Sequence, residues 1–227
     1  MPLQDVHFWL SEAIGWRWSS LVQCLERVFT PGSGEWVRHV MDQETAKYVG
    51  GLDYAGMDAL EISGEKWKDF GFGTYRSIGF EEFDVCERPL AIEAFDVVII
   101  EQVLEHVLWP FRAARHLHQM LRGGGVLVVT TPFLVKIHNC PFDCSRWTEL
   151  GLKHLLAEGG FALEDIQTGS WGNRICAGKS YYRVPFYVPW LHTLQNDPKY
   201  PLVIWAFARK PDARRASEAR SNGAVQA

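Results

Sequence analysis

Two runs rich in Val and other β-branched residues limit what this chain can fold into: FDVVII at 95–100 and VLVVTT at 126–131. Such runs are typical of strands buried on both faces of a sheet. Between them, apolar residues from Pro110 to Leu121 recur at helical spacing, and the glycines at 123–125 predict the end of that helix. Strands that alternate with helices in this way predict a mostly parallel sheet covered on both faces.

Weaker patterns supply the remaining elements. We expect further strands at 59–63, 74–80, 161–168 and 201–210, and further helices at 65–72 and 147–158. Residues 171–200 are rich in aromatics and have no clear period, and so long an excursion favours an antiparallel last strand. The predicted class is α/β: a Rossmann-like doubly wound sheet, mostly parallel with an antiparallel last strand, plus N-terminal helices. Ligands of such sheets bind at the carboxyl ends of the strands.

The chain divides into three parts by composition. Residues 1–50 form an N-terminal helical appendage, with one helix expected in 3–30 and another from Trp36; it serves either as packing or as a lid over the site. Residues 51–210 form the main domain, in which 171–200 is an insertion that contributes to the substrate region. The polar residues 211–227 have almost nothing to bury and are expected to be disordered.

Charge and composition argue against several classes of function. The 227 residues carry a formal net charge of -4 with both signs interspersed, so no basic surface for nucleic acid is expected. No apolar run reaches the roughly 18 residues that span a bilayer, and the first residues lack the features of a secretion signal. The 5 cysteines are an odd, scattered set, which argues against a disulfide framework. We expect a cytoplasmic protein without membrane or nucleic-acid partners.

The central motifs resemble a known enzyme family. FDVVIIEQVLEHVLWPFRAARHLHQMLRGGGVLVVTTP is similar to the central block of class I S-adenosylmethionine-dependent methyltransferases, and HNCPFDCSRWTELGLKHLLAEGGF is similar to the block that follows. The resemblance covers roughly residues 55–210. It is nearest to the small-molecule methyltransferases of quinone, sugar and natural-product pathways. It implies S-adenosylmethionine as cofactor, S-adenosylhomocysteine as product and a small-molecule acceptor.

In that family the first strand ends in an acid and a glycine-bearing turn, where a Cβ would keep the backbone from the cofactor. Glu61 and Gly64 match this pattern, but Ser63 replaces a glycine; the alternative is simply the end of a buried strand. The resemblance implies that Glu81 or Glu82 binds the ribose, unless both are solvated loop charges, and that Asp84 is the acid beside the adenine amino group. The resemblance implies a cofactor site formed by Glu61, Ile62, Ser63, Gly64, Glu81, Glu82, Phe83, Asp84, Val85, Glu101, Gln102 and Val103.

The catalytic candidates are Glu105, His106 and His138, the first two in the loop after the strand at 95–100. Methyl transfer is an in-line displacement, and a hydroxyl acceptor must also lose its proton to a base. His106 is the first candidate for this base and His138 the second; alternatively, His106 caps or packs at the helix start. A sugar-containing or oxygenated acceptor is expected to meet Phe133, Arg146, Trp147, Trp171, Asn173 and Arg174.

No metal is expected from the sequence. Some relatives carry E-x-x-E-H in this loop and bind a divalent cation, but Gln102 stands here in place of the first acid and Glu101 comes one residue early. His138, Cys140 and Cys144 offer soft ligands without a second pair nearby, which argues against a structural zinc.

Two other functions fit the same sequence less well. A methyltransferase-like binding or scaffold protein that has lost catalysis would explain the replaced glycine at Ser63 and the compressed segment GFEEFDVCERPL. A nicotinamide-dependent enzyme is disfavoured because the G-x-G-x-x-G pattern is absent. The aromatic residues between 181 and 190 form either a lid, a homodimer surface or part of the core.

Overall fold

The computed structural model describes residues 34–181 and 184–212. Two compact units divide the chain: Met1–Glu44, Leu134–Lys136 and Trp171–Val203 form one, and Thr45–Phe133, Ile137–Ser170 and Ile204–Ala227 form the other. The helix expected in 3–30 and nearly all of the tail expected at 211–227 lie outside the described residues. No helix among the described residues is both long and apolar enough to cross a membrane.

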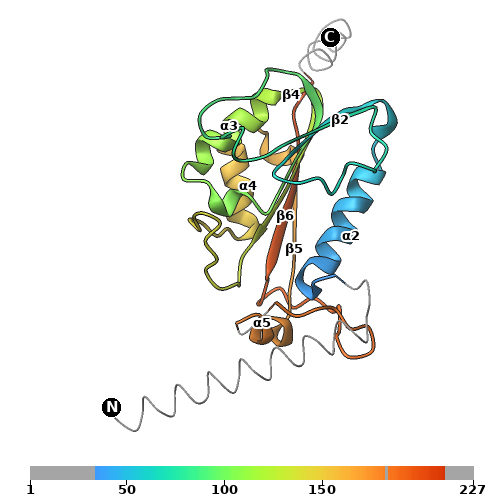
Figure 1. Ribbon diagram of the computed structural model, residues 1–227, viewed down its shortest axis with the longest axis vertical. Helices are drawn as coiled ribbons and strands as arrows, with labels where there is room; N and C mark the ends of the chain where they lie inside the picture. Colours follow the sequence, from blue (N-terminus) through green and yellow to red (C-terminus); the bar gives the residue numbers. More distant parts are fainter. Residues whose placement is uncertain (1–33, 182–183, 213–227) are drawn as a thin grey trace, which may run out of the picture. The chain divides into compact units, whose positions relative to one another are not determined.

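A six-stranded sheet with the order β2-β1-β3-β4-β6-β5 forms the centre of the second unit (Figure 1). Its strands are β1 (Asp58–Ile62), β2 (Thr74–Ile78), β3 (Phe95–Glu101), β4 (Leu121–Pro132), β5 (Ile166–Trp171) and β6 (Val203–Arg209). β1 pairs in parallel with β2 and β3, and β3 pairs in parallel with β4. The last strands are antiparallel, which confirms the predicted class of sheet.

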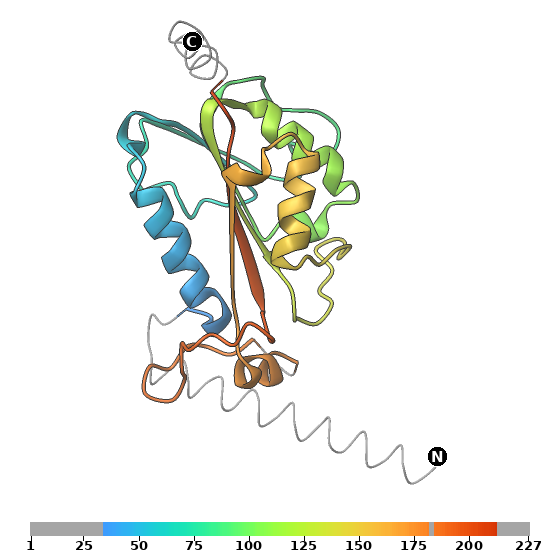
Figure 2. The same ribbon diagram turned by 180° about the vertical axis from the view of Figure 1, so that it is seen from behind.

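Helices α3 (Pro110–Met120) and α4 (Glu149–Glu158) lie on the same face of this sheet (Figure 2). The buried side of α3 consists of small and aliphatic residues at helical spacing: Ala113, Ala114, Leu117 and Met120. The Thr148 hydroxyl accepts a hydrogen bond from the Gly151 N–H at 3.1 Å and caps α4. A Cβ on Gly159 would lie 2.8 Å from the Ala114 Cβ, so the two helices approach closely.

Within the described part of the chain, the remaining α-helices are α2 (Trp36–Gly50) and α5 (Arg174–Ser180). The expectation of a helix beginning at Trp36 is confirmed. α5 lies in the segment whose sequence had no clear period, and it begins where the Asn173 side chain accepts the Cys176 N–H at 2.9 Å. Its 7 residues are too few to produce a recognisable helical repeat.

The glycine run at 123–125 corrects one prediction, because it belongs to β4 and does not end α3. α3 ends at Met120 and the chain turns directly into the strand. The Gly124 N–H donates to the Lys210 carbonyl at 2.9 Å, and the Lys210 N–H donates to the Gly125 carbonyl at 2.8 Å. Gly124 has a φ of 82°, a conformation that other residues rarely adopt.

Two further predictions were wrong in part. Residues 65–72 form turns and bends where a short helix was expected. The strand expected at 161–168 begins only at Ile166, since Leu163–Asp165 form a 3-10 turn before it. Both segments are too short for a local pattern to separate a turn from a regular element.

Candidate active site

The carboxyl ends of β1 and β3 lie side by side because the two strands are parallel neighbours. Each strand leaves the sheet through a residue in the left-handed conformation: Ser63 with a φ of 62° and Gln102 with a φ of 55°. Left-handed residues turn the chain sharply, which opens the edge of the sheet for a ligand. The two loops predicted to bind a cofactor therefore meet at this edge.

Glu61 stabilises the conformation of the first of these loops. Its carboxylate is buried and accepts the backbone N–H groups of Lys66 at 3.1 Å and Trp67 at 3.0 Å, and the Tyr75 hydroxyl at 2.6 Å. A Cβ on Gly64 would overlap Glu61 Oε1, so glycine is the residue that fits this turn. Burial and the Glu61 charge raise the pKa of Tyr75 and keep its hydroxyl a donor. The buried acid near the end of β1 therefore stabilises the loop that follows, a role that its position in the sequence did not reveal.

Glu101 receives two donors from the same loop. Lys66 Nζ lies 3.0 Å from one of its carboxylate oxygens, and Trp67 Nε1 donates to the other at 3.2 Å. The Glu101 side chain is only 6% exposed. The end of β3 therefore holds a carboxylate that already binds an ammonium group.

A cavity of about 610 Å³ is lined by residues of the loop after β3 and of the segment after β2. Asp84 and His106, which come from separate loops, both line it. Phe80, Trp109 and Phe142 supply exposed aromatic surface. A cavity of this size with a few polar groups is typical of a small-molecule site.

The predicted cofactor residues between 81 and 85 differ in how deeply they are buried. Glu81 and Glu82 are exposed, whereas Phe83 and Val85 belong to the hydrophobic core. Asp84 is half-buried, and one of its oxygens accepts the Cys86 N–H at 2.7 Å. Of these five residues, Asp84 is the one that reaches the cavity.

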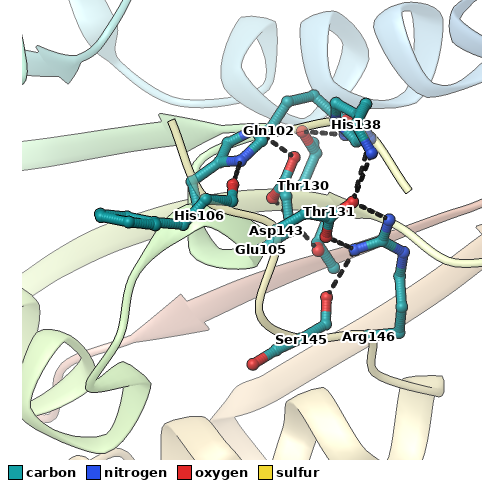
Figure 3. Close-up of polar contacts among 10 residues, drawn as sticks. Gln102, Glu105, His106, Thr130, Thr131, His138, Asp143, Ser145 and Arg146 are labelled. Carbon is teal, nitrogen blue, oxygen red and sulfur yellow. Dashed lines mark hydrogen bonds and ion pairs between the residues drawn. The ribbon is translucent and has the colours of Figure 1, made fainter. Parts of the chain in front are cut away.

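The three catalytic candidates come together in one cluster (Figure 3). Glu105 is fully buried; its Oε2 accepts the Thr131 hydroxyl at 3.4 Å, while among the described residues no donor meets its Oε1. Burial raises the pKa of Glu105 to about 7. His106 Nε2 lies 3.7 Å from Glu105 Oε1. The rings of His106 and His138 meet edge to face with centroids 5.1 Å apart.

Neighbouring groups fix both imidazoles. His106 Nδ1 lies 2.5 Å from the Phe142 carbonyl, which only accepts, so Nδ1 carries the hydrogen and Nε2 is the basic nitrogen of the neutral ring. His138 Nδ1 lies 3.3 Å from Asp143 Oδ2, and the His138 backbone N–H donates to the same oxygen at 2.8 Å. Arg146 donates to both Asp143 oxygens and lowers the pKa of that acid to about 2.

The predicted substrate residues do not form one group. Phe133 and Trp147 pack against the core, and Arg146 is held by Asp143. Trp171, Asn173 and Arg174 belong to the other compact unit. There Trp171 is buried and donates to the Leu194 carbonyl at 2.9 Å, Asn173 caps α5, and Arg174 lies over the Tyr200 ring. Their contact with an acceptor stays a prediction.

The other predicted residues have structural contacts. Ile62 is buried in the core and Val103 packs against it. The Gln102 side chain donates to the Thr130 hydroxyl at 3.2 Å. Sequence reasoning missed Tyr75, Thr131, Phe142 and Asp143, which hold the predicted groups in place. Asp143 and Arg146 are three residues apart with opposite charge, a signal that indicates a local ion pair.

The comparisons with known proteins agree on one protein family. A model described as a methyltransferase domain matches residues 29–166, which is more than half of the 227 residues. A probable S-adenosylmethionine-dependent methyltransferase of Mycolicibacterium smegmatis is 27% identical over 144 residues, which are 61% of this chain and 52% of that protein. The chain thus spans about half the length of this curated relative.

Solved structures share the fold at low identity. A methyltransferase from Mesorhizobium loti has a TM-score of 0.51 at 14% identity, covering 77% of this chain and 100% of its own. One from Archaeoglobus fulgidus has a TM-score of 0.50 at 15% identity, covering 82% and 98%. Phosphoethanolamine N-methyltransferase 2 of Haemonchus contortus, solved with phosphomonomethylethanolamine and S-adenosylhomocysteine, has a TM-score of 0.51 at 13% identity, covering 82% and 56%.

Proposed function

This chain belongs to the methyltransferase-domain family, and we propose that it transfers the methyl group of S-adenosylmethionine to a hydroxyl of a small oxygenated molecule. The observation that carries the proposal is the shared cavity: Asp84 and His106 line the same space of about 610 Å³. A group that recognises the cofactor and a group that accepts a proton are both needed for this reaction, and here they face one cavity.

The residues at the sheet edge fit the cofactor. Its α-ammonium group needs a carboxylate, and Glu101 already accepts an ammonium group, that of Lys66, at 3.0 Å. Its adenine amino group needs an acceptor, which Asp84 offers at the cavity wall. The turn at Ser63 and Gly64 brings backbone to the same edge. When bound, the cofactor supplies an electrophilic methyl group on a sulfonium.

Removal of the acceptor's proton is the second task of the site. In our proposal His106 takes this proton at Nε2, the nitrogen that the Phe142 carbonyl leaves basic. The buried Glu105 carboxylate, 3.7 Å away, stabilises the imidazolium that results. His138, whose ring meets that of His106, is the second candidate for the same role.

The cavity wall favours an acceptor with a flat apolar face and several oxygens. Trp109 is 55% exposed and lies under the Arg112 guanidinium at 4.7 Å, so its ring is available beside a cation. Sugars and oxygenated rings stack on such indoles and offer hydroxyls to charged neighbours. A sugar-containing or natural-product metabolite is therefore the proposed substrate class.

Calorimetry with S-adenosylmethionine and S-adenosylhomocysteine on the full chain tests the cofactor. Binding that weakens in Asp84→Ala supports the proposal, and the absence of binding overturns it. Transfer of a labelled methyl group into a small-molecule extract then tests the acceptor. His106→Gln is expected to lower turnover far more than cofactor affinity, whereas His154→Gln, on the exposed side of α4, changes neither.

A second candidate is a binding or scaffold protein that does not turn over. The observation in its favour is the bulk of the first loop, since Lys66 and Trp67 both contact Glu101. It predicts no heat with either cofactor form in wild type and no methyl transfer.

A further inference from the structure

We propose that Glu105, His106 and His138 bind one divalent transition-metal ion. These side chains each offer one ligand atom, and the three atoms lie within 4.8 Å of one another. Two imidazoles and one carboxylate are donors that zinc and related ions prefer. The residues come from two loops, one after β3 and one after β4, so the sheet edge brings them together.

The buried carboxylate is an independent sign of a missing cation. Glu105 is 0% exposed, and no donor among the described residues meets its Oε1. His106 Nε2, at 3.7 Å from that oxygen, is too far for a hydrogen bond. A buried charged oxygen without a partner is costly, so native structures normally provide one. An ion held between Oε1 and the imidazoles would supply that partner.

Both imidazoles are oriented as metal ligands usually are. The Phe142 carbonyl binds Nδ1 of His106, which directs the lone pair of Nε2 towards Glu105. Asp143 contacts Nδ1 of His138 and is itself held by Arg146. A carbonyl or carboxylate on the far nitrogen of the imidazole is the common outer contact of metal-bound histidine. The outer contacts therefore exist on both histidines of this cluster.

Only a small adjustment separates the cluster from bonding geometry. Ligand bonds of about 2.1 Å place neighbouring ligand atoms roughly 3–3.5 Å apart. The Glu105–His106 separation is 3.7 Å, and the largest separation in the cluster is 4.8 Å. The His138 side chain is 44% exposed, and its ring would have to shift towards Glu105 and His106 to close the remaining gap. The donor set favours a zinc-like ion over magnesium or calcium, which prefer oxygen ligands.

This inference departs from the sequence expectation of no metal. That expectation rested on the missing acid at Gln102, whose side chain donates to Thr130 in the structure. The proposed ligand set does without residue 102 and takes His138 as its third member. Three protein ligands leave a coordination position open. If the proposed function holds, an acceptor oxygen can bind there and lose its proton more easily, and the ion then takes the place of the imidazole base, because Nε2 of His106 is one of its ligands.

Titration of the metal-stripped full chain with Zn²⁺, and with Co²⁺ followed by its visible absorption, tests the site without any enzymatic assay. We expect one equivalent of ion in wild type and roughly 100-fold weaker binding in Glu105→Gln, His106→Gln and His138→Gln. Asp143→Asn should weaken binding by about 10- to 100-fold through His138. His154→Gln on α4 is the matched control and should bind as wild type does.

Two outcomes would overturn the site: no stoichiometric ion in wild type, or binding lost in Cys140→Ser/Cys144→Ser but kept in the histidine variants. The second outcome would assign the ion to the exposed thiols of the same loop. Circular dichroism of each variant checks its fold, and His138→Gln keeps the test available if Glu105→Gln fails to fold. Calorimetry with S-adenosylmethionine on the same samples separates the two proposals, because ion binding does not require the cofactor.

Discussion

Lys66 places its ammonium group 3.0 Å from the Glu101 carboxylate and so connects the loop after β1 to the end of β3. The contact occupies the carboxylate that we propose for the cofactor's own ammonium group. The Lys66 side chain and the cofactor would then compete for the Glu101 carboxylate. Substitution of either residue therefore tests whether the cofactor's ammonium group binds at this edge of the sheet.

Glu101→Gln is expected to weaken S-adenosylmethionine binding by roughly 10- to 100-fold, since a hydrogen bond to a charged group contributes about 1.5–3 kcal/mol. Lys66→Met should tighten binding, because it removes the competing cation. Calorimetry measures both effects. Wild-type affinity in Glu101→Gln would show that the ammonium group binds elsewhere.

Gly64→Ala is expected to lower the free energy of unfolding by about 1–3 kcal/mol, because the new Cβ overlaps the Glu61 carboxylate. The same displacement should weaken cofactor binding, since Glu61 holds the backbone of Lys66 and Trp67. Denaturant unfolding measures the first effect and calorimetry the second. Gly79→Ala is the control, because a Cβ there meets nothing within 4 Å. Equal stability of the two variants would contradict the overlap between a Cβ at position 64 and the Glu61 carboxylate.

His118 is expected to make the fold sensitive to acid. Burial, followed by the charge of Lys210, lowers its pKa in the folded state, so the unfolded chain binds its proton more readily. Stability therefore falls as the pH drops through about 6.5, the pKa of an unperturbed histidine. Denaturant unfolding across this range should show a smaller loss for His118→Gln than for wild type. His154→Gln, which changes an exposed histidine, should follow wild type.

The cysteines are expected to differ sharply in reactivity. Cys176 is fully buried, and burial raises its pKa to about 12, so almost none of it is thiolate at neutral pH. Cys140 and Cys144 are exposed. Iodoacetamide followed by peptide mass spectrometry should therefore modify these two in the native protein and reach Cys176 only after unfolding. Early modification of Cys176 would indicate that α5 opens readily.

The main sheet could be predicted because its signals are local. The runs at 95–100 and 126–131, which are rich in β-branched residues, lie within β3 and β4, since a strand buried on both faces is typically a nearly continuous apolar run. The pair Glu105 and His106 stood out for a similar reason, as polar residues directly after such a run. Their neighbourhood with His138 followed once β3 and β4 were placed side by side.

Other features depend on contacts between distant residues. The role of Glu61 depends on Tyr75 and on two backbone N–H groups, and no local pattern encodes that arrangement. The glycines at 123–125 look like a helix end but pair with Lys210, which is far along the chain. Trp171 and Asn173 were predicted as substrate contacts because one is aromatic and the other polar; both are buried, and their contact with an acceptor stays a prediction.

The place of β6 in the sheet has a consequence for how the chain acquires its fold. β6 is synthesised after the other five strands of this sheet, but it lies between β4 and β5. While residues 203–209 are still inside the ribosome, β5 has no partner and one side of β4 is unpaired. The sheet closes only when residues 203–209 emerge, so its completion is governed by contacts of high sequence separation, which form slowly. Until then the unpaired edge of β4 can pair with strands of other chains, which makes the nascent protein prone to aggregation at that edge.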